Sequence, residues 1–237
     1  MLTGPQFLVG NLARLRQRIE DATHAAGRPP GSVTLIGVSK AQSADLVAAA
    51  IAAGVTDLGE NYLQEALPKI AALPRTGLQW HYIGQLQSNK TRPVAEHFDW
   101  VHTVDRLKLA ARLSEQRPIH CEPLKICLQV KLGDEDAKGG VAPGELPALA
   151  YEVAHLPRLT LRGLMCVPPA SDDAAVQRSY FGELRRLLEG LRAGGLALDV
   201  LSMGMSGDFE SAIQEGATHV RVGTTLFGPR VRHDAKQ

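Results

Sequence analysis

Apolar and polar positions along the chain follow two different periods, which predict its secondary structure. Residues 6–26 place Leu8, Leu12, Leu15 and Ile19 on one side of a helix, with charged residues on the other. We therefore expect an amphipathic helix within the first 30 residues, ahead of the rest of the fold. The tail at 231–237 is polar, and we expect it to be frayed.

After this helix, short apolar runs rich in β-branched residues alternate with helix-like stretches. The predicted strands are 33–40, 56–61, 79–84, 100–104, 124–130, 159–167, 200–204 and 219–223. The predicted helices are 44–53, 62–72, 90–97, 106–116, 144–155, 173–193 and 208–215. This alternation predicts a parallel α/β sheet with right-handed crossovers, and eight strands can close into a (β/α)8 TIM barrel. An open doubly wound sheet is the alternative, although the chain lacks a dinucleotide fingerprint and a Walker-type phosphate loop.

Length and composition fit one barrel that binds a small molecule. A chain of 237 residues, 44% of them hydrophobic, predicts a single domain over 1–237. The 26 basic and 25 acidic residues give a net charge of +1 and are mixed along the chain, so we expect no nucleic-acid partner and no membrane association. Cys121, Cys127 and Cys166 are odd in number and lack metal-ligand spacing. Together with the absence of a secretory apolar core, they predict a cytoplasmic protein without a metal. We also expect the chain to be a monomer.

Lys40 closes the first predicted strand. The run at 33–40 reads as a buried strand with one amine at its carboxyl end, and that end of a barrel strand is where catalytic groups gather. Partial loss of hydration would lower the pKa of such an amine and make its neutral, Schiff-base-forming state accessible. Position alone, however, favours an ordinary solvated lysine.

Two Gly- and Ser/Thr-rich turns follow the last two predicted strands. Residues 201–208 read Leu-Ser-Met-Gly-Met-Ser-Gly-Asp, and residues 219–225 read His-Val-Arg-Val-Gly-Thr-Thr. Backbone N–H groups and hydroxyls at such turns favour an anion, and barrels often bind phosphate after strands seven and eight. The alternative is ordinary turn chemistry, because these residue types are common in turns and caps.

In a barrel, the candidate groups converge on one rim. The residues at or just beyond predicted strand ends, or in the loops that follow them, are Lys40, Asn61, His81, Lys138, Ser206, Arg221, Gly223 and Thr224. An amine, a phosphate cradle and an arginine are what a pyridoxal phosphate site needs. Arg221, facing the pyridine nitrogen, would keep that nitrogen unprotonated and weaken the ring as an electron sink. A salt bridge from Arg221 to Asp208 or Glu210 is an equally good interpretation.

Seven motifs together resemble those of the pyridoxal phosphate homeostasis proteins, from about residue 33 to residue 230. The motifs are Val-Ser-Lys at 38–40, Gly-Glu-Asn-Tyr at 59–62, His-Tyr-Ile-Gly-Gln-Leu-Gln-Ser-Asn-Lys at 81–90, Lys-Gly-Gly at 138–140, Arg-Gly-Leu-Met at 162–165, Gly-Met-Ser at 204–206 and Val-Arg-Val-Gly-Thr-Thr-Leu-Phe-Gly at 220–228. The resemblance implies a single barrel of the alanine racemase N-terminal type. It also implies pyridoxal phosphate held on Lys40, with the cofactor phosphate bound by Ser206, Gly223 and Thr224.

By the same resemblance, Arg221 approaches the ring nitrogen, and Asn61 and His81 contact the ring. One position departs from the family pattern. Many relatives carry a second lysine two positions after the cofactor lysine, where this chain has Gln42, so a transfer role for that amine does not carry over. Lys138 is the remaining auxiliary candidate, because Gly139 and Gly140 follow it and acids precede it, although a solvated loop explains this stretch equally well.

The resemblance implies a protein that binds pyridoxal phosphate and buffers or delivers it to apo-enzymes, and so affects amino-acid and keto-acid pools. Efficient catalysis is not expected, because two-domain alanine racemases take a second base from a domain that this chain lacks. Two alternatives stay open. One is a small racemase whose second base is His81 or Tyr62, and the other is a Schiff-base aldolase, which would be colourless before substrate arrives.

Overall fold

The computed structural model describes residues 5–133 and 139–228, and its eight strands form one closed parallel barrel. The strands are β1 (Thr34–Val38), β2 (Asp57–Glu60), β3 (Gln79–Tyr82), β4 (Trp100–Val104), β5 (Leu124–Gln129), β6 (Leu159–Met165), β7 (Val200–Ser202) and β8 (His219–Val222). Each strand pairs with the next in sequence, and β8 closes the barrel against β1. The predicted TIM barrel is thus confirmed, and the open sheet is excluded.

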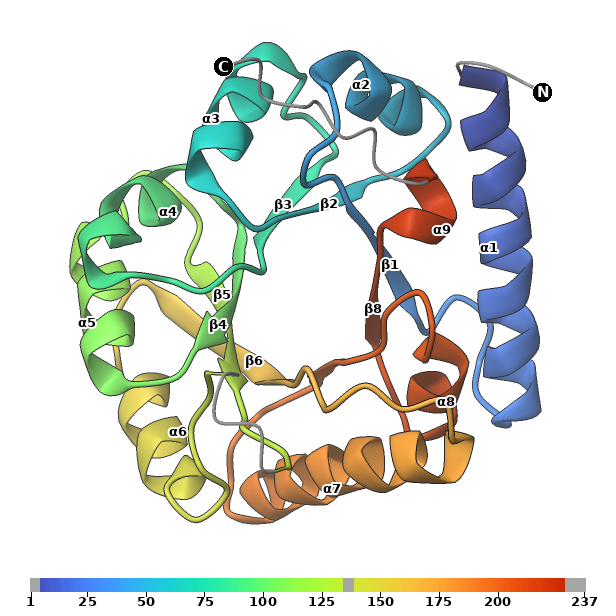
Figure 1. Ribbon diagram of the computed structural model, residues 1–237. Coiled ribbons are helices and arrows are strands. Elements are labelled where there is room, and N and C mark those ends of the chain that lie inside the picture. Colours follow the sequence, from blue (N-terminus) through green and yellow to red (C-terminus); the bar gives the residue numbers. More distant parts are fainter. Residues whose placement is uncertain (1–4, 134–138, 229–237) are drawn as a thin grey trace, which may run out of the picture.

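Helices surround this barrel (Figure 1). They are α1 (Pro5–Ala25), α2 (Ala44–Ala52), α3 (Leu63–Ala72), α4 (Thr91–His97), α5 (Leu107–Gln116), α6 (Leu146–Ala154), α7 (Ala174–Ala193), α8 (Phe209–Gln214) and α9 (Thr224–Phe227), with a 3-10 turn, η1, at Ser88–Lys90. Each predicted helix has a counterpart within a few residues. The short η1 and α9 were not predicted, because three or four residues are too few to show a helical period.

The predicted N-terminal helix is confirmed as α1, which covers the outside of the barrel near the point where β8 pairs with β1. Leu8, Leu12, Leu15 and Ile19 are all buried, as their spacing predicted. The helix packs on α8 and α9 (Figure 1), and the Asn11 side-chain amide donates to the Leu226 carbonyl at 3.0 Å. Because α9 has only four residues, α1 supplies the apolar cover that a full-length last helix would give.

Two separate apolar clusters stabilise the fold. The larger one lies between strands and helices and includes the fully buried rings of Trp80, Phe98 and Phe181. The smaller one contains Trp100, Cys127, Met165 and Val200, with Val167 packed against it. Polar residues that include His81, His102 and Arg221 are also buried, and the His81 and His102 rings lie against Trp100 of the smaller cluster. Buried polar groups need hydrogen-bond partners, so the barrel interior is held partly by a polar network.

Two glycines differ in how much space surrounds them, so their replacement by alanine tests the packing. A methyl group on Gly163 in β6 would lie 1.9 Å from the Val200 carbonyl oxygen, whereas one on Gly190 in α7 would meet no atom within 4 Å. Gly163→Ala should therefore lower the free energy of unfolding by about 1–3 kcal/mol or more. Gly190→Ala should raise it by about 0.5–1 kcal/mol through helix propensity. Urea unfolding of both variants measures this, and equal effects would contradict the packing described.

Candidate functional site

A cavity of about 390 Å³ opens at the carboxyl ends of the strands, on the side of β1 and β8. Its volume is in the usual range for small-molecule sites. Six of the seven predicted cofactor-binding residues line it: Lys40, Asn61, Ser206, Arg221, Gly223 and Thr224. The exception is His81. Gln42, the position that departs from the family pattern, also lines the cavity.

The wall formed by the last two β/α turns carries hydroxyl and backbone donors. Gly204 has φ +91°, and a methyl group there would meet Ala212 and the Phe209 backbone at less than 3 Å, so the turn that presents Ser206 needs a glycine. Gly223 directly precedes α9, and Thr224 begins it. The first N–H groups of a helix have no acceptor within that helix. This wall therefore offers the donors that an anionic group requires.

Arg221 places a buried cation at one side of the cavity. Its side chain donates from Nη1 to Ser202 Oγ and from Nη2 to the Cys166 carbonyl, both at 2.9 Å. Burial lowers the pKa of Arg221, yet a guanidinium stays protonated. In the part of the chain that the structure describes, neither predicted acid pairs with it. Asp208 instead accepts from the Met205 N–H, and Glu210 pairs with Arg18.

Lys40 lies two residues beyond β1, between Ser39 and Ala41, each of which donates a hydrogen bond to an acidic side chain. On one side, buried Glu60 accepts from the Ser39 hydroxyl at 2.6 Å and from Lys69 at 2.7 Å. On the other side, the Ala41 N–H donates to Glu65 at 2.7 Å, and Ala41 has φ +59°, which is costly for a residue with a side chain. The backbone around Lys40 is thus held in one conformation.

The sequence reasoning missed the buried pair of Glu60 and Lys69. Lys69 also donates to the Ser39 carbonyl at 2.7 Å, so it joins α3 to the end of β1. Burial raises the pKa of Glu60, and the hydrogen bonds from Lys69 and Ser39 oppose that shift. A signal was present. Lys69 falls at helical spacing from Leu63 and Ala66, on the face of α3 that the structure buries.

Asn61 has an unsatisfied acceptor at the cavity wall. Its Oδ1 is buried and has no hydrogen-bond partner in the described part of the chain. Buried amide oxygens without a partner are rare in native proteins, so this atom fits a ligand that carries a donor group. With the Lys40 amine, the Arg221 guanidinium and the hydroxyls of Ser206 and Thr224, the cavity can hold a phosphorylated, ring-containing aldehyde such as pyridoxal phosphate.

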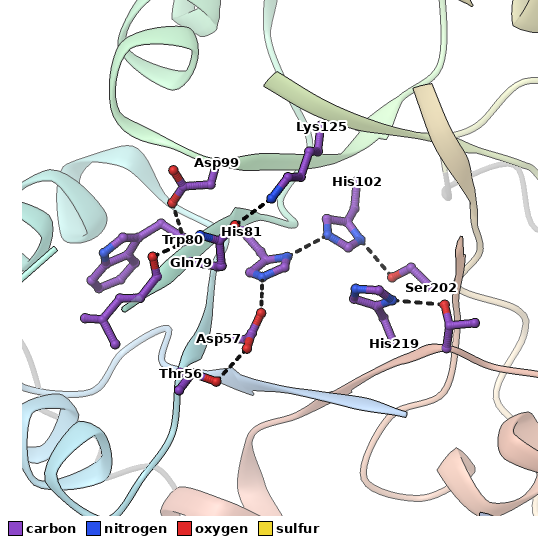
Figure 2. A network of polar contacts seen from close by, with 12 residues as sticks. Thr56, Asp57, Gln79, Trp80, His81, Asp99, His102, Lys125, Ser202 and His219 are labelled. Carbon is purple, nitrogen blue, oxygen red and sulfur yellow. Dashed lines mark hydrogen bonds and ion pairs between the residues drawn. The ribbon is translucent and has the colours of Figure 1, made fainter. Parts of the chain in front are cut away.

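The structure places His81 inside the barrel instead of in the cavity. It lies within β3 with no exposed surface, and its ring contacts Asp57 at 3.0 Å and His102 at 2.9 Å (Figure 2). His81 pairs in register with Trp100, the first residue of β4, so it lies level with the start of that strand and not at the carboxyl rim. Its expected ring contact stays a prediction without support from this geometry.

The other candidates lie away from the cavity or outside the description. Tyr62 is 56% exposed and lines a neighbouring hollow with Gln64, Gln87 and Lys90. Lys138 falls outside the described residues, so its auxiliary role stays a prediction. Within the described ranges, no three His, Cys, Asp or Glu side chains are grouped so that they could hold a metal ion. None of the described helices has the length and apolar character needed to cross a membrane.

Known proteins resemble this chain over nearly its whole length. A family model described as alanine racemase, N-terminal domain, matches residues 10–231. The pyridoxal phosphate homeostasis protein of Pseudomonas aeruginosa is 57% identical over 220 residues, covering 93% of this chain and 94% of that protein. PipY of Synechococcus elongatus, solved with pyridoxal phosphate bound, is 40% identical, with a TM-score of 0.81 over 93% of this chain and 100% of its own.

A more distant structure shows the shared fold alone. An alanine racemase from Corynebacterium glutamicum is 17% identical, with a TM-score of 0.74. The match covers 97% of this chain and 63% of the racemase. The part common to both is therefore a barrel of the alanine racemase N-terminal type, as the sequence predicted.

The interior histidines predict how stability depends on pH. Burial lowers the pKa of His81 and His102, and it lowers the pKa of His219 to about 3. An unfolded histidine titrates near pH 6.5, so below that pH the unfolded state binds protons that the folded state does not. The free energy of unfolding should be constant near pH 7.5 and fall between pH 6.5 and 5, by up to about 1.4 kcal/mol per pH unit for each histidine.

Urea unfolding at pH 7.5, 6.0 and 5.0 measures this dependence. His219→Asn should make the fall shallower, because it removes one group with a depressed pKa. A wild-type stability that does not change across this range would contradict neutral, buried rings.

Proposed function

Because the chain belongs to the pyridoxal phosphate homeostasis proteins, we propose that it binds pyridoxal 5'-phosphate in the rim cavity and buffers or delivers it without rapid catalysis of its own. The observation that carries this proposal is the convergence of Lys40, Arg221 and the Ser206 and Thr224 hydroxyls on one cavity. A relative with 40% identity, PipY, has been solved with pyridoxal phosphate bound. Such binding would link the protein to amino-acid and keto-acid balance.

Each cavity residue has a distinct task in this proposal. The bound cofactor would supply an aldehyde for a reversible covalent bond to the Lys40 amine. Ser206 and Thr224 donate hydroxyl hydrogen bonds to the phosphate, and Gly223 lets the backbone approach it. Arg221 donates toward the ring nitrogen. Asn61 accepts from a polar substituent of the ring through its otherwise unpartnered Oδ1.

The same geometry weighs against the racemase alternative. A racemase needs a second base in reach of the substrate, but His81 is fully buried between Asp57 and His102, and Tyr62 lines another hollow. Arg221 remains charged, so it holds the ring nitrogen unprotonated and disfavours the delocalisation that amino-acid chemistry requires. The aldolase alternative explains Lys40 but gives no role to Arg221.

We extend the proposal to the setting in which the protein works. The receiving partners are apo-enzymes that need pyridoxal phosphate, and the protein acts as a cytoplasmic monomer. All three cysteines are free thiols, which agrees with a reducing compartment. Burial raises the pKa of Cys127 and of Cys166 to about 12, so neither thiol competes for the cofactor aldehyde.

Lys40 should be the residue that carries the cofactor. The protein incubated with pyridoxal phosphate should turn yellow, and borohydride reduction followed by peptide mass mapping should find the added mass on Lys40. Lys69, a buried lysine of α3 engaged with Glu60, serves as the internal control and should stay unmodified. A reduced adduct on another lysine alone, or no adduct, would show that the assignment is wrong.

Removal of one phosphate donor should weaken binding of the cofactor and leave the fold intact. Ser206→Ala and Thr224→Val each remove a hydroxyl that would bond a charged group, at a cost of about 1.5–3 kcal/mol, or roughly 10- to 150-fold in Kd. Equilibrium dialysis measures the change. Thr225→Val is the matched control, because Thr225 does not line the cavity. Pyridoxal, which lacks the phosphate, should bind the wild-type protein and all three variants with the same affinity. If Ser206→Ala and Thr224→Val weaken the binding of both ligands equally, these hydroxyls do not bind the phosphate.

Delivery without turnover is the functional outcome we expect. The loaded protein should transfer pyridoxal phosphate to an apo-enzyme, measured as recovered apo-enzyme activity, while its own racemase, transaminase and decarboxylase rates stay far below about 1 per second. If Lys138 takes part, Lys138→Ala should slow delivery without removing the bond at Lys40, whereas replacement of Lys108, an exposed lysine of α5, by Ala should change neither. Turnover at ordinary enzymatic rates would favour the racemase alternative.

A further inference from the structure

A continuous chain of hydrogen bonds crosses the barrel interior and ends on Arg221. Asp57 Oδ1 lies 3.0 Å from His81 Nε2, and His81 Nδ1 lies 2.9 Å from His102 Nε2. His102 Nδ1 lies 2.8 Å from Ser202 Oγ, which in turn accepts from Arg221 Nη1 at 2.9 Å. Figure 2 shows the first four residues side by side in the interior. The five residues come from β2, β3, β4, β7 and β8.

The Asp57 end of this chain fixes the direction of its hydrogen bonds. An ionised carboxylate can only accept, so His81 carries its proton on Nε2 and donates it to Asp57. Neutral His81 then accepts at Nδ1 from His102 Nε2, and neutral His102 accepts at Nδ1 from the Ser202 hydroxyl. Ser202 Oγ in turn accepts from Arg221, which can only donate. Each ring is neutral, donates once and accepts once, which suits two side chains without exposed surface.

This arrangement gives a buried cation a distant counter-charge. Arg221 is 4% exposed, and within the described residues no carboxylate forms an ion pair with it. The aligned dipoles of Ser202 and the two imidazoles present their acceptor ends toward the guanidinium and their donor ends toward Asp57. A buried charge is costly without such compensation. Because arginine does not release its proton, the chain orients the guanidinium and does not conduct protons to the cavity.

We propose that Asp57, His81, His102 and Ser202 are positioning residues that hold the Arg221 guanidinium in the geometry that selects a ring nitrogen in the cavity. The ring nitrogen as the target rests on the proposed function, whereas the chain itself can be tested without any cofactor. The ligand class is an aromatic aldehyde phosphate whose ring carries a nitrogen acceptor facing Arg221.

His219 provides a matched control within the same interior. It lies on β8 two residues before Arg221, and its Nδ1 contacts Thr218 Oγ1 at 2.9 Å. Its ring packs near those of His81, Trp100 and His102, yet it is not a member of the hydrogen-bonded chain. Replacement of His102 or His219 by Phe therefore removes one interior imidazole in each case, but only the first interrupts the chain to Arg221.

The binding experiment compares pyridoxal phosphate with its carbon analogue, in which a C–H replaces the ring nitrogen. Wild-type protein should bind pyridoxal phosphate at least about ten-fold more tightly than the analogue, as expected for one hydrogen bond from a charged donor. His102→Phe should remove most of that ratio, and His219→Phe should preserve it. A merely structural role of His102 would weaken both ligands equally and leave the ratio unchanged, which would overturn the proposal.

A second measurement keeps the test decisive if His102→Phe does not fold. Two-bond 1H–15N correlation spectra of the wild-type protein without cofactor report the tautomer of each histidine, and both His81 and His102 should carry the proton on Nε2. A proton on Nδ1 of either ring would overturn the chain. If wild-type protein binds neither ligand, the proposed function fails, while the tautomers still decide whether the chain exists.

Discussion

The pairing of the first strand with the last is the contact on which the site depends. Ile36 of β1 lies opposite Arg221 of β8, and Gly37 lies opposite Val222. This parallel register brings the carboxyl end of β1, where Lys40 follows, beside the end of β8, where Gly223 and α9 follow. A methyl group on Gly223 would lie only 3.2 Å from the Val38 carbonyl oxygen, so the two strand ends are in close contact. The Lys40 amine and the proposed phosphate donors, far apart in sequence, thus share one cavity.

Most of the fold and much of the site could be predicted, because both follow from local patterns. Runs of β-branched residues marked the strands, and the rule that barrel chemistry gathers at carboxyl ends placed Lys40, Ser206 and Thr224 correctly on one rim. The interior network was not foreseeable. Asp57, His81, His102 and Ser202 lie on four strands whose facing side chains are set by barrel closure and register, which sequence spacing does not reveal.

His81 illustrates the limit of positions assigned from sequence alone. It lies opposite Trp100, the first residue of β4, and this register, which follows from barrel closure, places its ring in the interior and not at the rim. The pair of Glu60 and Lys69 shows a different limit. A charged residue on the buried face of a helix conflicts with the apolar pattern, and that conflict marked a group that holds the backbone beside Lys40.

One bound geometry underlies the proposed function, so a crystal structure of the protein soaked with pyridoxal phosphate tests it most directly. It should show density continuous from Lys40 Nζ into the cofactor, the phosphate at Ser206, Gly223 and Thr224, and the ring nitrogen facing Arg221, with Ser202 and His102 behind the guanidinium. A cofactor bound in another hollow, or a ring turned so that its nitrogen points away from Arg221, would contradict it.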